Sequence, residues 1–154
     1  MDADPVADQL PFRPFCDGCT TREQSLPLGA GVSTPVQILA MARELLDRAS
    51  PETAGLWPRA AALLGRQALE MAVDEYWVAR RIPLDSCATR QQLICLREYL
   101  DDDDLAGRVH HTWNELSRAC HQHPYELPPT AAELERCIDS VAAFTAKVAG
   151  SHPE

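Results

Sequence analysis

The residues best suited to chemistry lie close together in the stretch 117–125, which reads SRACHQHPY. Arg118 is followed after four residues by His123, and Tyr125 comes two residues later. An arginine carries a permanent planar cation that suits a phosphate, and a histidine can accept or donate a proton near neutral pH. RNA cleavage without a metal requires a base for the 2′-hydroxyl, an acid for the departing oxygen and positive charge beside the phosphate. Arg118 and His123 are therefore candidate catalytic residues.

The spacing of this pair limits how one chain can use it. Residues five apart on a regular helix are separated by about 140° around the axis, so a single helix does not aim both side chains at one point. A last turn that frays before Pro124, or a second subunit, would have to bring them together. The alternative is structural: Arg118 would form a surface ion pair, and His123 would cap a helix C-terminus, where the helix dipole favours an imidazolium.

The stretch 117–125, within the helical bundle predicted below for about residues 34–150, resembles the HEPN family (higher eukaryote and prokaryote nucleotide-binding domains). Its members carry an arginine, four to six variable residues and a histidine at the end of the corresponding helix. Members that are paired with a minimal nucleotidyltransferase often add a tyrosine two residues after the histidine, which is the position of Tyr125.

The resemblance implies a metal-independent endoribonuclease that acts as a homodimer, with the motifs of two protomers forming one composite site. Arg118 would then hold the scissile phosphate and His123 would transfer protons. Tyr125 would be the hydroxyl that a nucleotidyltransferase-type antitoxin modifies with AMP. The resemblance also implies a role in toxin–antitoxin or phage-defence biology, RNA or a nucleotide as the ligand, and no cofactor.

One position departs from the family's pattern. Its ribonucleases usually have Asn, Asp or His directly after the motif arginine, and this chain has Ala119. His121, or the motif of a second subunit, would have to supply the missing polar group. The net charge of -9 also argues against non-specific electrostatic binding of a nucleic-acid backbone over a broad surface. The alternative function is thus a non-catalytic binding or regulatory module that recognises a nucleotide or a protein partner.

Cys16 and Cys19 form a C-x-x-C pair, which can supply two of the four ligands of a structural zinc ion. No second pair follows at comparable spacing, although Cys120 with His121, or the same segment of another subunit, could complete a site. Two free thiols are the favoured interpretation, so we expect no bound metal.

The composition predicts one folded domain in the cytoplasm. The chain has 154 residues, 45% of them hydrophobic and 24% charged, which suits a single apolar core. No run approaches the roughly 18 apolar residues of a membrane span, and the N-terminus is acidic where a signal peptide would be basic and then apolar. We therefore expect no membrane partner, and cysteines that remain reduced.

Apolar residues at spacings of three and four predict an all-α fold, an antiparallel up-and-down bundle of four main helices and one shorter helix. The expected helices span residues 34–49, 58–81, 86–100 (the shorter one), 104–123 and 130–150. The first and the last helix each start with a capping box. Gln37 lies three residues after Thr34, and Glu133 lies three residues after Thr130. In the acidic run 101–104 the last residue, Asp104, is expected to cap the fourth helix.

The organisation along the chain follows from these helices. Residues 1–32 are rich in proline and glycine without a sustained period, which predicts an irregular N-terminal arm. The bundle takes residues 33–150, and 151–154 form a tail. In the first helix Val36 is expected to face the core together with Leu39, Ala42 and Leu46. In the second helix four charged residues are expected to face away from the buried stripe: Arg59, Arg66, Glu70 and Asp74.

Overall fold

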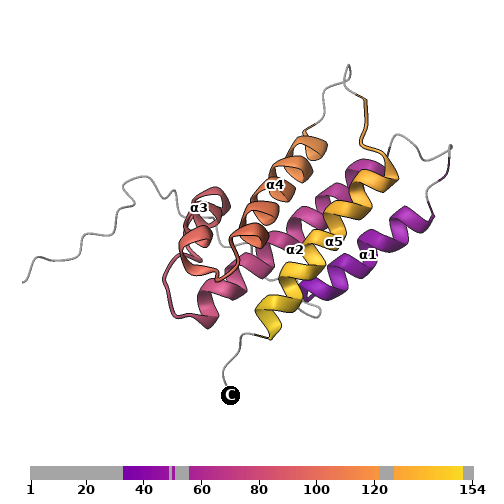
Figure 1. Ribbon diagram of the computed structural model, residues 1–154. Coiled ribbons are helices and arrows are strands. Elements are labelled where there is room, and N and C mark those ends of the chain that lie inside the picture. Colours follow the sequence, from indigo (N-terminus) through magenta and orange to yellow (C-terminus); the bar gives the residue numbers. More distant parts are fainter. Residues whose placement is uncertain (1–32, 49, 51–55, 122–126, 151–154) are drawn as a thin grey trace, which may run out of the picture.

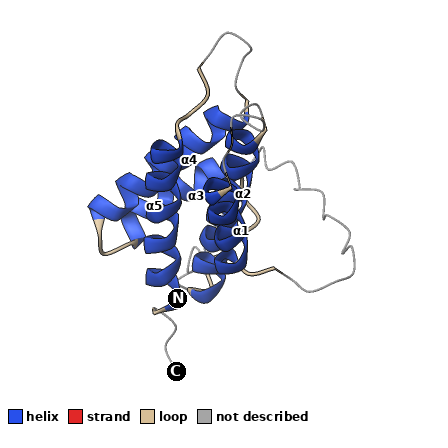
Figure 2. Ribbon diagram, turned by 90° about the vertical axis from the view of Figure 1, so that its right-hand side faces the viewer, coloured by secondary structure: helices blue, strands red, loops and turns tan. Residues whose placement is uncertain are grey.

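The computed structural model describes residues 33–48, 50, 56–121 and 127–150, and that part of the chain is helical without strands (Figure 2). The helices are, in order, α1 (Pro35–Asp47), α2 (Trp57–Ala79), α3 (Thr89–Tyr99), α4 (Asp103–Cys120) and α5 (Ala131–Ala149). The four long helices run alternately in opposite directions, and the short α3 lies beside one end of the bundle (Figure 1). The predicted antiparallel bundle of four main helices and one shorter helix is confirmed.

Helix α2 is the centre of this arrangement, because it packs against each of the other four helices. Around the bundle, α1 contacts α2, α2 contacts α4, α4 contacts α5, and α5 contacts α1. Helix α3 packs mainly on α4 and α2. The position of α4 is thus set from two sides, by α2 and by α5.

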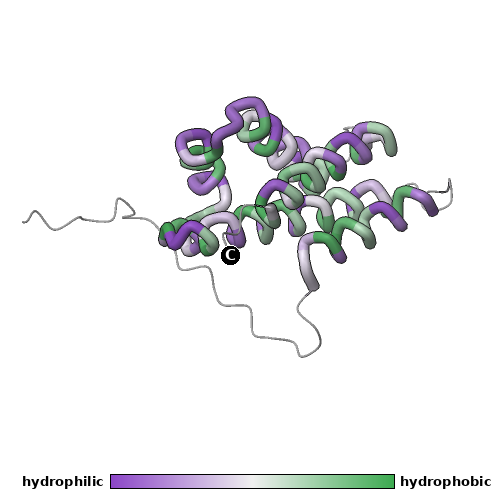
Figure 3. The backbone as a smooth tube through the Cα atoms, turned by 60° about the horizontal axis from the view of Figure 1, so that its bottom comes forward, coloured by the Kyte–Doolittle hydropathy of each residue, from purple (hydrophilic) through white to green (hydrophobic). Residues whose placement is uncertain are grey.

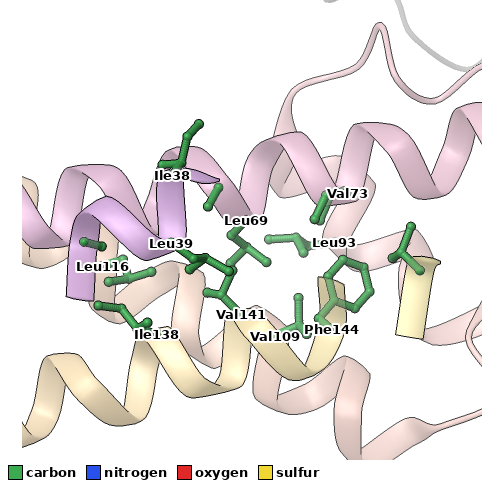
Figure 4. Packing of buried hydrophobic residues seen from close by; sticks show 14 of the residues in the cluster. Ile38, Leu39, Leu69, Val73, Leu93, Val109, Leu116, Ile138, Val141 and Phe144 are labelled. Atoms are coloured by element: carbon green, nitrogen blue, oxygen red, sulfur yellow. The ribbon is translucent and has the colours of Figure 1, made fainter. Parts of the chain in front are cut away.

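The core is a continuous apolar cluster to which every helix contributes, and Figure 4 shows its middle, with Leu39, Leu69 and Val141 close together. Along the tube in Figure 3, hydrophobic and hydrophilic residues alternate on each helix, as expected when one face is buried. Three helices approach closely at Gly65 of α2. A Cβ atom at this position would lie 3.4 Å from a Leu116 methyl carbon and 3.7 Å from Ile138 Cγ1.

Both predicted capping boxes are present. The Gln37 amide N–H donates to Thr34 Oγ1 (3.3 Å) and the Thr34 N–H donates to Gln37 Oε1 (2.9 Å). Thr130 and Glu133 form the same reciprocal pair at the start of α5, at 2.8 and 3.3 Å. These bonds satisfy backbone donors that the first turn of a helix leaves without partners.

Two details of the sequence-based prediction are wrong. The cap of α4 is Asp102, whose Oδ1 accepts from the Leu105 N–H at 2.8 Å, and Asp104 lies inside the first turn, where the helix dipole favours a carboxylate. Val36 is 64% exposed, and Ile38 is buried in its place. At 100° per residue, Val36 lies about 100° from the centre of the face formed by Ile38, Leu39, Ala42 and Leu46.

Gly107→Ala is expected to stabilise the protein. Gly107 lies inside α4, and a Cβ atom there would meet nothing within 4 Å. Glycine inside a helix costs about 0.5–1 kcal/mol relative to alanine, so the free energy of unfolding in urea should rise by about this amount. The control is Gly65→Ala, which gains the same helix propensity but places its Cβ against Leu116. A loss of stability in Gly107→Ala would contradict the open space that surrounds this position.

None of the helices described combines the length and the apolar character that crossing a membrane requires.

Candidate functional site

The end of α4, which carries the motif arginine, is held by α2. His121 is the C-cap residue of α4, and its backbone N–H donates to the carbonyl oxygens of Ser117 (3.2 Å) and Arg118 (3.1 Å). From the first turn of α2, Arg59 Nε donates to the carbonyl oxygen of Cys120 at 3.0 Å. The last carbonyl groups of a helix lack partners within it, and a cation there is favoured by the dipole. Arg59 therefore fixes the point at which the chain leaves α4.

Arg118 lies on the last turn of α4 and points to solvent, with 70% of its side-chain surface exposed. Its Nη2 lies 3.1 Å from Oε1 of Glu115, one turn earlier on the same helix. Arg118 therefore does form the surface ion pair that the structural alternative expects. Exposed pairs of this kind contribute about 0–1 kcal/mol, so an incoming phosphate would displace the Glu115 carboxylate at little cost.

Arg118 borders a pocket of about 350 Å³ between the end of α4 and the start of α5. This volume lies within the range of small-molecule sites. Helix α4 contributes Glu115, Arg118 and Ala119 to the wall, and the remaining lining comes from the segment that leads into α5 and from its first two turns: Leu127, Pro128, Pro129, Thr130, Glu133, Leu134 and Cys137.

The pocket wall is acidic rather than basic. Hydrogen bonds from the backbone N–H and the hydroxyl of Thr130 lower the pKa of Glu133, so this carboxylate is charged at neutral pH. Burial raises the pKa of the Cys137 thiol, and the Glu115 carboxylate raises it further, so Cys137 is neutral. With Glu115 and Glu133 on the wall, the favourable place for an anion is the exposed guanidinium of Arg118.

On its other side α4 is joined to α2 by a partly buried polar cluster. Arg66 Nε donates to Glu70 Oε1 at 2.9 Å, and the Trp113 indole N–H donates to the same oxygen at 3.1 Å. The Arg66 guanidinium also lies 5.6 Å from the centre of the Trp113 ring. Burial raises the pKa of the Cys120 thiol, and the cations of Arg66 and Arg59 only partly oppose this. Cys120 is thus a buried neutral thiol.

This cluster revises the expectation that the charged residues of α2 simply face away from the core. Arg59, Arg66 and Glu70 all contact α4, where they orient the helix that carries Arg118. The four-residue spacing of Arg66 and Glu70 is a sequence signal for their ion pair. No such signal exists for Arg59, whose partner Cys120 lies 61 residues further along the chain.

The candidate site residues divide into two groups. Arg118 and His121 lie on one turn at the exposed end of α4. His123 and Tyr125 lie in the segment 122–126, and Cys16 and Cys19 within 1–32, so these four are outside the described residues. Among the residues that the structure does describe, no three His, Cys, Asp or Glu side chains gather as a metal ion would require.

Comparisons of the chain with models of protein families, with curated proteins and with solved structures found no match. The resemblance to the HEPN family therefore depends on the motif of Arg118, His123 and Tyr125 and on the helical architecture.

Proposed function

We propose that the protein is a HEPN-like, metal-independent endoribonuclease that acts as a homodimer, with Arg118 and His123 as its catalytic residues. The observation that carries the proposal is the position of Arg118. Its guanidinium is largely exposed on the last turn of α4, two residues before the chain leaves the helix towards His123, and it borders a pocket of about 350 Å³. A phosphate can reach this cation directly.

The proposed reaction is a transesterification within the RNA strand. His123 accepts the proton of the 2′-hydroxyl, and the 2′-oxygen attacks the phosphorus while the bond to the 5′-oxygen of the next nucleotide breaks. His123 of the partner subunit donates the proton that the departing oxygen needs. Arg118 stabilises the charge that develops on the phosphoryl oxygens. The products are a 2′,3′-cyclic phosphate and a 5′-hydroxyl, and neither a metal nor a cofactor takes part.

A homodimer is part of this proposal, because residues five apart on a helix diverge by about 140°. A two-fold axis near the ends of two α4 helices would surround one phosphate with two copies of Arg118 and of His123. The family resemblance further supports Tyr125 as the residue modified with AMP by a nucleotidyltransferase-type antitoxin, and with it a role in toxin–antitoxin or phage-defence biology.

The test is RNA cleavage by the purified full-length protein in the presence of EDTA. We expect 2′,3′-cyclic phosphate ends, because the 2′-hydroxyl is the nucleophile and no metal is required. The cleaving species should sediment as a dimer. Cleavage that disappears with EDTA and returns with a divalent ion would contradict the mechanism, and cleavage by a monomer would contradict the composite site.

The rival function is a non-catalytic module that binds a nucleotide or a protein partner, and one observation favours it. Ala119 is only 8% exposed and lines the pocket, so the position after the motif arginine presents a methyl group there. His121 is the polar side chain that follows on the same end of α4, and it is exposed. Binding of RNA or a nucleotide without any cleavage under the conditions above would support the rival.

A further inference from the structure

Arg59 lies directly beside the candidate site although it belongs to the first turn of α2. Its Nε is 3.0 Å from the carbonyl oxygen of Cys120, the residue before His121. Arg59 is an exposed residue, and within the described part of the chain this is its one hydrogen bond. An arginine has five N–H donors, so the bond to Cys120 leaves the terminal part of the guanidinium group available to a ligand.

Arg59 differs from the arginines near it in the ion pairs that the described residues form. Arg66 is paired with Glu70 and Arg118 with Glu115. Within the described part of the chain, by contrast, no Asp or Glu forms an ion pair with Arg59. In a protein of net charge -9, a cation next to His121 without an acidic partner among the described residues favours an anion locally.

Arg59 and Arg118 approach the end of α4 from different sides. Arg118 borders the pocket between α4 and α5, whereas Arg59 comes from α2. Arg118 and Cys120 are two residues apart and therefore point about 160° away from each other around α4, which puts the two guanidinium groups on different sides of the helix end. Two separate phosphates of one strand can reach them there.

We propose that Arg59 is a second phosphate-binding residue, so that the ligand of this site is an RNA strand that spans at least two phosphates and not a mononucleotide. The proposal rests on the proposed function and deepens it, because it extends the site from Arg118 across the end of α4 to α2. The rival role of Arg59 is purely structural, as a cap for the α4 C-terminus. The two roles differ in whether the positive charge itself contacts the ligand.

The variant Arg59→Gln separates these roles. The glutamine Nε2 is the same number of bonds from the backbone as the arginine Nε, so it can still donate to the Cys120 carbonyl while the charge is removed. The matched control is Arg108→Ala, which removes one exposed charge from α4 twelve residues before Cys120, or about 18 Å along the helix. Arg59→Lys keeps the charge.

The measurement is fluorescence anisotropy of a labelled hexauridylate with 2′-O-methyl sugars, which cannot be cleaved, over a series of KCl concentrations. For Arg59→Gln we expect about tenfold weaker binding at low salt, and a slope of log affinity against log salt that is smaller in magnitude by about 0.7, the value for one lost phosphate contact on a single strand. Arg59→Lys should keep the wild-type slope. Binding of uridine monophosphate should not differ between Arg59→Gln and wild type.

An Arg59→Gln slope equal to those of wild type and Arg108→Ala would show that Arg59 contacts no phosphate, and would overturn the proposal. The proposal would also be overturned if Arg59→Gln weakened the binding of the hexamer and of uridine monophosphate by the same factor. Either result would leave the ribonuclease function intact if the wild-type protein cleaves RNA in EDTA. Absence of that cleavage would contradict the proposed function itself, whatever the salt slopes are.

Discussion

Arg118→Ala is expected to slow RNA cleavage by about two to three orders of magnitude, which is the usual loss when one donor that stabilises transition-state charge is removed. The Arg118 side chain is 70% exposed and its ion pair with Glu115 is on the surface, so the variant should melt at nearly the wild-type temperature. The measurement is the rate of cleavage of a defined RNA in EDTA, with circular dichroism as the check on folding.

The matched control is Glu115→Gln, which removes the carboxylate that pairs with Arg118 and keeps the size of the side chain. Because Glu115 competes with the phosphate for the same guanidinium, this variant should cleave at least as fast as wild type. Cleavage that survives in Arg118→Ala would exclude Arg118 from the mechanism. Equal losses in both variants would instead indicate that the ion pair matters as a structural unit.

Trp77→Ala is expected to cause the largest loss of stability that a single substitution produces in this core. Trp77 belongs to α2, and its side chain is fully buried in the core. Its ring makes edge contacts with the rings of Tyr76 (5.0 Å between centres) and Tyr99 (5.4 Å). Truncation of a buried aromatic side chain to alanine costs about 3–5 kcal/mol, a large part of the 5–15 kcal/mol that stabilises a typical domain. Urea denaturation measures the difference.

Trp77→Phe tests the cause of this loss. Among the described residues the indole N–H of Trp77 is buried without a hydrogen-bond partner, so phenylalanine removes an unsatisfied donor together with part of the ring. The loss should be well under half of that in Trp77→Ala. Val78→Ala is the surface control, because Val78 is the next residue of α2 and is 60% exposed; its effect should stay within about 0.5 kcal/mol. A loss in Trp77→Phe equal to that in Trp77→Ala would contradict this account.

The sequence predicted the helices well because their signals are local. The capping boxes at Thr34 and Thr130 each need only a hydroxyl and a carboxyl or amide three residues later, and both form as expected. The error at Asp104 arose because four consecutive aspartates offer several equivalent caps, and the packing of Leu105 and Ala106 into the core decides which one is used. Val36 was misplaced since spacing alone does not fix the centre of the buried face.

The candidate site could be predicted only in part. The position of Arg118 near the end of its helix follows from Pro124, which disfavours a helical residue before it. The contact of Arg59 with Cys120 joins residues that are 61 positions apart in the chain, and the pocket lies between two successive helices, so no pattern within one helix encodes either feature. Such features depend on the packing of α4 between α2 and α5.

The alternating directions of the helices also determine where other molecules can be attached. Helix α1 begins and α5 ends at the same end of the bundle, opposite the end of α4 that carries Arg118 (Figure 1). Helix α5 has 19 residues and is therefore about 28 Å long, which is the distance between the two ends. A fluorescent label, a solid support or a fused domain joined just before α1 or just after α5 would therefore be held on the far side of the molecule from Arg118, and the two attachment points would be neighbours.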